Sequence, residues 1–331
     1  MNSNSSKKNT AALVRISAVF FILIILFCGR SAANASLKDG KEMDSAEIIL
    51  KQGVILFESR DIDGAMKKYE EALKLRPEYE DAIYNMALCY QHKKDNAKAI
   101  ELYEKIIAKN QKHYAAFLNI GISYEDSGNS EKALSYLQKA MEIDPRRFET
   151  YYNLSNIYLE MKKYDNAVEV CKIGAALNPS HDRIHNNMGY AYFFSGKKNE
   201  GIKCAEIAVG LNPKNEVAHF NLATYLDDAG DIKKAYEHYM AALQLKPDYP
   251  DALLNAGIIE AQNGDYVKAE THFMKAKQLN SKDARAYQNL GILYDMKNEY
   301  NKALAEYQKA VSLDSTLMRE LGARIGELSK M

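Results

Sequence analysis

Residues 80–113 read EDAIYNMALCYQHKKDNAKAIELYEKIIAKNQKH, and residues 114–147 read YAAFLNIGISYEDSGNSEKALSYLQKAMEIDPRR. The two stretches have the same length of 34 residues and align without a gap, with an alanine at the twentieth position of each. The same step continues along the chain through Ala65, Ala99, Ala133, Ala167, Gly201, Ala235, Ala269 and Ala303. A period of this length with a small residue at one position indicates stacked helical hairpins. The sequence therefore predicts a solenoid rather than a globule.

Eight repeats of this length fill residues 46–317. They span residues 46–79, 80–113, 114–147, 148–181, 182–215, 216–249, 250–283 and 284–317. Each repeat is predicted to hold two helices. Glycine occurs near the middle of four repeats, at Gly128, Gly196, Gly230 and Gly264, where the positive φ that ends a helix is available to it. Prolines such as Pro77 and Pro145 close the second helix in five repeats, because proline cannot continue a helix.

Small residues and large apolar residues recur at fixed positions of the repeat. The eighth and twenty-seventh positions take small residues in most repeats, as Gly121 and Ala140 do in residues 114–147. The eleventh and twenty-fourth positions take large apolar residues, most often tyrosine, as at Tyr90 and Tyr103. Glu260 departs from this pattern, since it stands at the eleventh position of residues 250–283.

These positions resemble the signature of the tetratricopeptide repeat (TPR) family, and the resemblance covers 272 of the 331 residues. One copy of the motif is degenerate, whereas eight copies in phase are highly specific. The resemblance implies an all-α fold in which antiparallel helix pairs stack into a right-handed superhelical solenoid with a concave inner groove. Residues 318–331 follow with Met318, Leu321, Ile325 and Leu328 on one helical face. We expect this stretch to form a capping helix over the open end of the solenoid.

The first 35 residues predict a secretory signal peptide. Lys7 and Lys8 precede the apolar run at residues 16–28, which is too short to cross a bilayer as a helix. Ala33 and Ala35 then have the spacing of a signal peptidase site. A polar lead-in over residues 36–45 would follow. The repeats are expected outside the cytoplasm, as a periplasmic or secreted bacterial protein. The alternative is that residues 1–35 stay uncleaved and anchor the chain in the inner membrane.

Composition and motifs indicate a protein without chemistry of its own. Lys plus Arg and Asp plus Glu both number 44, so no basic excess points to nucleic acid. No phosphate-binding loop, zinc-protease helix or Cys-x-x-Cys motif occurs. His181 and His185 have the spacing of two ligands on one helix, but no third ligand is evident. We therefore predict no enzymatic activity, no cofactor and no metal site.

Asparagine occupies the sixth position of repeats two to eight. The column comprises Asn85, Asn119, Asn153, Asn187, Asn221, Asn255 and Asn289. The resemblance implies that the first helix of each repeat lines the groove and that its sixth position faces inward. An amide side chain offers both a donor and an acceptor, so the column could hold the backbone of an extended peptide. The alternative is a structural ladder, in which each asparagine bonds within its own or a neighbouring repeat.

Other inward positions suggest which partner the groove would select. Aromatic residues and carboxylates recur there, among them Tyr152, Tyr190, Phe193, Phe194, Phe220 and Asp227. An acidic groove with an aromatic middle favours an extended segment that is basic or contains aromatic residues. Phe193 and Phe194 together are expected to form an exposed apolar patch.

These observations predict a protein-binding scaffold that holds an extended peptide segment or partner protein in its groove. Export suggests a role in the assembly of an envelope or secretion complex. The alternative is a structural or oligomeric component, which would associate through its convex face or through the Phe193 and Phe194 patch and could form homo-oligomers.

Overall fold

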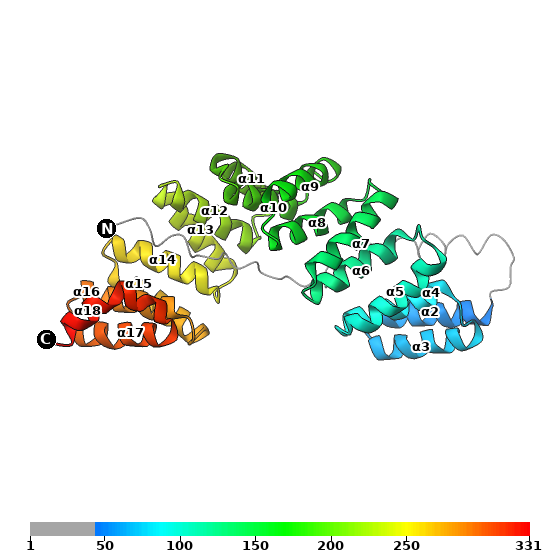
Figure 1. The fold of residues 1–331 in the computed structure, drawn as a ribbon, viewed down its shortest axis with the longest axis horizontal. Coiled ribbons are helices and arrows are strands. Elements are labelled where there is room, and N and C mark those ends of the chain that lie inside the picture. Colours follow the sequence, from blue (N-terminus) through cyan, green and yellow to red (C-terminus); the bar gives the residue numbers. More distant parts are fainter. Residues whose placement is uncertain (1–43) are drawn as a thin grey trace. The chain divides into compact units, whose positions relative to one another are not determined.

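A computed structural model describes residues 44–331, and all regular structure within this range is helical (Figure 1). The all-α prediction is therefore confirmed. The predicted signal peptide or anchor at residues 1–35 and most of the polar lead-in lie outside the described residues.

The described residues divide into two units, 44–179 and 180–331. The first unit holds four helical hairpins: α2 (Ser45–Glu58) and α3 (Ile62–Leu75), α4 (Glu80–His92) and α5 (Asn96–Lys109), α6 (Tyr114–Asp126) and α7 (Ser130–Ile143), and α8 (Phe148–Glu160) and α9 (Tyr164–Leu177). The second unit holds four more: α10 (Asp182–Phe194) and α11 (Lys198–Leu211), α12 (Glu216–Asp228) and α13 (Ile232–Leu245), α14 (Pro250–Gln262) and α15 (Tyr266–Leu279), and α16 (Ala284–Met296) and α17 (Tyr300–Leu313). It ends with the short 3₁₀ helix η3 (Ser315–Leu317) and with α18 (Met318–Leu328).

The turn inside each hairpin is set by one backbone conformation. The fifteenth residue of every repeat has positive φ: Arg60, Lys94, Gly128, Lys162, Gly196, Gly230, Gly264 and Asn298. Four repeats thus use glycine, as predicted, and four force a residue with a side chain into the same left-handed region, at a cost of about 1–2 kcal/mol each. The next residue often caps the second helix. Asp95, for example, accepts a hydrogen bond of 3.3 Å from the backbone N–H of Lys98.

Small residues bring the two helices of a hairpin together. Each alanine of the 34-residue ladder is completely buried, from Ala65 to Ala303. The eighth position lies against the ring at the twenty-fourth: a Cβ on Gly257 would lie 2.6 Å from Cε1 of Phe273. Packing explains why the ladder has Gly201 in place of an alanine. A Cβ at this position would lie 3.0 Å from the carbonyl oxygen of Gly189. Its glycine therefore permits a close approach of α10 and α11.

Glu260, the other departure, is buried on α14 but has hydrogen-bond partners. The hydroxyl of Tyr236 donates to one of its carboxylate oxygens at 2.9 Å, and Nδ1 of His272 lies 2.8 Å from the other. A carboxylate takes the place of an aromatic ring here because two polar groups from α13 and α15 meet it inside the second unit.

Within each unit, every second helix packs against its own first helix, and all but the last also pack against the first helix of the next repeat. First helices of successive repeats also contact each other, as α2 with α4 and α12 with α10. First helices thus form one continuous face in each unit, which we call the first-helix face. At the carboxyl end, α18 packs against α17 and buries Leu321 and Leu328 in the same apolar cluster as α16 and α17. The predicted capping helix is confirmed.

Candidate protein-binding surface

Asn119 is the centre of a buried polar network in the first unit. Its Nδ2 donates hydrogen bonds to the hydroxyls of Tyr84 at 2.9 Å and Tyr103 at 3.2 Å. Tyr103 gives its own proton to Oε1 of Gln91 at 2.6 Å, and Nε2 of Gln91 donates to Ser123 at 2.8 Å. Since the one proton of Tyr103 is used in this way, its hydroxyl can only accept from Asn119. The network therefore fixes which end of the Asn119 amide faces the tyrosines.

The second unit repeats this arrangement at Asn255. Nδ2 of Asn255 donates to the hydroxyl of Tyr239 at 3.0 Å, and that hydroxyl lies 3.4 Å from Oγ1 of Thr224, to which it donates. In both Asn119 and Asn255, the side-chain nitrogen thus donates a hydrogen bond to a buried tyrosine of the preceding repeat. In both, the side-chain oxygen accepts no hydrogen bond from residues 44–331 and stays available as an acceptor.

The remaining asparagines differ in their partners. Asn153 donates to the backbone oxygen of Glu149 at 2.8 Å, and Asn221 donates to Oδ1 of Asn186 at 2.9 Å. Asn187 is half-buried on α10. Asn85 and Asn289 are also half-buried, and their side chains make no hydrogen bond in the described part of the chain. The column therefore combines members tied into the protein with members whose amide groups are unused.

From the sequence, Tyr103 and Tyr239 are expected only to pack, and the role of their hydroxyls is not apparent. The available signal was a tyrosine at the twenty-fourth position followed by an asparagine at the sixth position of the next repeat. The signal is not sufficient, because Tyr69 and Asn85 have the same spacing and form no hydrogen bond within residues 44–331.

The candidate aromatic residues have different degrees of burial. Phe194 is 37% exposed, whereas Phe193 is half-buried because its ring stacks on Tyr225, with centroids 4.2 Å apart. Tyr190 packs against Phe194 at 4.4 Å. The expected exposed patch is thus reduced to Phe194 and part of its neighbours.

Two further aromatic candidates lie elsewhere. Phe220 is 4% exposed and packs against Tyr239 and Tyr249, so it belongs to the core of the second unit and has no ring face to offer a ligand. Tyr152, in the first unit, is half-buried and stacks on Phe148.

Three carboxylates of the first helices in the second unit pair with a lysine or an arginine. Asp251 pairs with Arg285 at 2.8 Å, and Asp295 is held by Arg324 of α18. Asp228 pairs with Lys198. Asp227 is half-buried on α12, and burial together with the neighbouring Asp228 carboxylate raises the pKa of its carboxyl.

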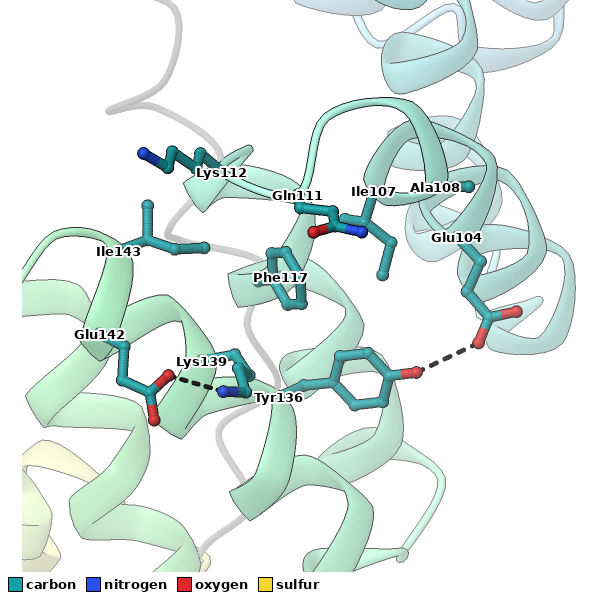
Figure 2. Close-up of a pocket in the computed structure, with 10 residues that line it drawn as sticks. All are labelled: Glu104, Ile107, Ala108, Gln111, Lys112, Phe117, Tyr136, Lys139, Glu142 and Ile143. Atoms are coloured by element: carbon teal, nitrogen blue, oxygen red, sulfur yellow. Dashed lines mark hydrogen bonds and ion pairs between the residues drawn. The ribbon is translucent and has the colours of Figure 1, made fainter.

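A cavity of about 850 Å³ opens in the first unit on the side of the second helices, between α5 and α7 (Figure 2). Ile107, Phe117 and Ile143 give it an apolar floor. Charged groups surround them: Lys139 pairs with Glu142 at 2.7 Å, and the Tyr136 hydroxyl donates to Glu104 at 3.3 Å. The sequence does not predict this cavity, because its repeat pattern places binding on the first helices.

Two observations concern membranes and metals. Among residues 44–331, none of the helices combines the length and the apolar character needed to span a bilayer. Within the same range, histidine, cysteine and carboxylate side chains do not gather in threes that could coordinate a metal ion.

The chain was compared with known families and structures. Residues 6–248 match the family model described as cilia and flagella-associated protein 70 C-terminal domain, and residues 248–316 match a tetratricopeptide repeat model. No curated protein matches the sequence. Among solved structures, the APC/C hetero-tetramer Cut9-Hcn1 is similar with a TM-score of 0.60 and 15% identity, over 87% of this chain and 56% of that one. PilF of Pseudomonas aeruginosa is similar with a TM-score of 0.58 and 21% identity, over 64% of this chain and 97% of that one.

The two structures show a shared fold, and the two family models together cover the repeats. The first model alone matches more than half of the chain, and both models describe TPR domains. With the 34-residue period, the paired helices and the buried small residues at fixed positions, these matches are decisive. The chain belongs to the tetratricopeptide repeat family.

Proposed function

We propose that this protein is an exported, non-enzymatic scaffold that binds an extended segment of a partner protein on its first-helix face. TPR proteins are in general protein-interaction scaffolds. The observation that carries the proposal is the fixed orientation of Asn119 and Asn255, whose nitrogens are held by buried tyrosines and whose oxygens are unused. An extended peptide presents a row of backbone N–H groups, and such oxygens can accept hydrogen bonds from them.

The side-chain amides of Asn85 and Asn289, which make no hydrogen bond within residues 44–331, are a second observation that supports the same proposal. A half-buried amide without a protein partner costs little only if water or a ligand completes its hydrogen bonds. The exposed ring of Phe194 and the carboxylate of Asp227 favour a segment that contains aromatic or basic residues. The identity of the peptide would then come from these side chains, and its backbone would be held by the asparagines.

Replacing Asn289 by alanine should separate a ligand-binding from a structural asparagine. Because Asn289 makes no hydrogen bond in the described structure, the free energy of unfolding should change by less than about 0.5 kcal/mol. Binding of peptides selected from a random dodecapeptide library by the wild-type chain should weaken about fivefold, the equivalent of one hydrogen bond. Asn119→Ala, by contrast, should destabilise the first unit by about 2 kcal/mol, because it removes two buried hydrogen bonds.

Urea unfolding and fluorescence anisotropy measure the two effects. Asn166→Ala is the matched control, since Asn166 is exposed on the second helix α9. If Asn289→Ala, Asn85→Ala and Asn166→Ala all bind the selected peptides as the wild type does, the asparagine column is a structural ladder and the proposal is wrong.

Export and a role in an envelope or secretion complex belong to the same proposal. They are supported by the charged start, the apolar run and the small residues of positions 1–35. Either cleavage or retention of this segment would place the repeats on the far side of the membrane from the cytoplasm.

A second candidate function is self-association or partner binding through other surfaces. The cavity between α5 and α7 favours it, because its apolar floor lies on the side of the second helices. The Phe194 ring offers another apolar contact. A molar mass that rises with concentration in light scattering, and is restored to the monomer by Ile107→Asp or Phe194→Asp, would establish this function. Phe194 is the better target than Phe193, whose ring packs on Tyr225.

A further inference from the structure

Asp227 differs from three other carboxylates on the first helices of the second unit. Asp251, Asp295 and Asp228 each have a cationic partner. Asp227 forms no ion pair and accepts no hydrogen bond from any residue within 44–331, although its side chain is half-buried. A carboxylate that is partly removed from water and left without a counter-charge is unfavourable in the free protein.

The chain itself contains the completed version of this site. Asp227 is the twelfth residue of the repeat at 216–249, and Asp295 is the twelfth residue of the repeat at 284–317. Arg324 binds Asp295 with both ends of its guanidinium: Nε lies 2.7 Å from one carboxylate oxygen and Nη2 lies 2.6 Å from the other. The twelfth position can therefore hold a guanidinium in the bidentate geometry that makes such pairs strong.

Residues 44–331 do not supply this partner to Asp227. Arg324 is the seventh residue counted from Met318, where a ninth repeat would begin, and the seventh residue of the repeat that follows Asp227 is Ala256. The methyl group of Ala256 is completely buried and carries no charge. The nearby hydroxyl of Tyr239 donates to Thr224 and is not used for Asp227. Both oxygens of Asp227 are thus left for a ligand.

We propose that Asp227 is a specificity residue of the first-helix face and that it binds the guanidinium of an arginine in the captured segment. This inference rests on the proposed function and names the chemistry of the partner. Arginine is the expected residue because Arg324 shows the fork geometry at the equivalent carboxylate, and a lysine ammonium would form only a single-point contact.

The test uses the full chain in mild detergent and random dodecapeptide pools with one central position fixed as arginine or as citrulline. Citrulline keeps the shape of arginine and removes its charge. The wild type should bind the arginine pool about tenfold more tightly, the effect of one charge-assisted pair. Asp227→Asn should reduce this preference to less than about twofold. The control Asp228→Asn removes the same charge one residue away. Because Asp228 is already paired with Lys198, this variant should keep the preference for arginine.

Three binding results would overturn the inference. If the wild type binds both pools equally well, Asp227 does not select arginine, and the proposed function still stands. If Asp227→Asn keeps the arginine preference, the guanidinium binds elsewhere. If the wild type binds neither pool, this inference and the proposed function fall together.

A stability measurement guards against a trivial loss of binding. Because burial and the neighbouring Asp228 carboxylate raise the pKa of Asp227 in the folded chain, ionisation of this group disfavours folding. Asp227→Asn should therefore keep or slightly raise the thermal midpoint. A lowered midpoint would show that Asp227 has a structural partner and would contradict the inference.

Discussion

Leu321→Asp is expected to unfold the carboxyl-terminal end of the chain, with a loss of about 3–5 kcal/mol in local stability. Leu321 is 5% exposed and packs with Leu328 in the cluster that α16 and α17 share. The substitution removes a buried leucine, which contributes about 2–3 kcal/mol, and leaves a carboxylate without a partner in its place. Because neighbouring repeats stabilise each other, the damage should extend from α18 into α17 and α16 before it reaches α12.

Hydrogen exchange of the full chain measures this effect repeat by repeat. Amide protection in α16–α18 should collapse while that of α4–α7 stays as in the wild type. Met318→Asp is the control on the same helix, since Met318 is 52% exposed and should tolerate the charge within about 0.5 kcal/mol. Retained protection of α17 in Leu321→Asp would show that α18 does not act as a cap.

Tyr103→Ala should destabilise the first unit by about 4 kcal/mol. The ring of Tyr103 is completely buried, and its removal leaves a cavity in the cluster that holds Tyr84 and Ile106. The substitution also leaves Asn119 and Gln91 without the hydroxyl that joins them. Tyr103→Phe keeps the ring and removes only the hydroxyl, so a smaller loss of about 1–3 kcal/mol is expected.

Urea unfolding of the three chains separates the ring from the hydroxyl. Tyr136→Phe is a matched control, because Tyr136 is half-buried at the cavity between α5 and α7 and its hydroxyl makes a longer bond of 3.3 Å. Equal stability of Tyr103→Phe and the wild type would mean that the polar network around Asn119 does not stabilise the fold. It would also remove the reason for the fixed orientation of that amide.

The backbone of this protein follows from its sequence because the same small positions recur in every repeat. Glu80 and Tyr114 begin the first helices of their repeats, as the period requires, and α18 covers the last repeat. Four glycines in the middle of their repeats predict the positive φ of the hairpin turn. The sequence did not show that Arg60, Lys94, Lys162 and Asn298 adopt it as well. Arginine and lysine have no preference for positive φ, and asparagine, which is enriched there, occurs at this position in only one repeat.

The side-chain partners of the candidate site could not be predicted in the same way. The partner of an asparagine at the sixth position depends on which side chains surround it. Tyr239 holds Asn255, whereas Phe273 has no hydroxyl to offer Asn289. Asn221 bonds to Asn186 instead, with an alanine at the twenty-fourth position of the preceding repeat. The burial of Phe220 and the stacking of Phe193 on Tyr225 likewise depend on pairs of residues in different helices. A period fixes the backbone, but it does not determine such pairs.

The left-handed residue at the fifteenth position of every repeat makes the repeats interchangeable at the level of the backbone. Lys94 and Gly128 have φ of 61° and 75°, although one is a lysine and the other a glycine. A gene in which codon 94 is joined directly to codon 129 would encode a chain shorter by one whole module, and both sides of the junction would already have compatible geometry. Chains of this design can therefore gain or lose modules by recombination inside the hairpin turn, and the length of the binding surface can change without a new fold.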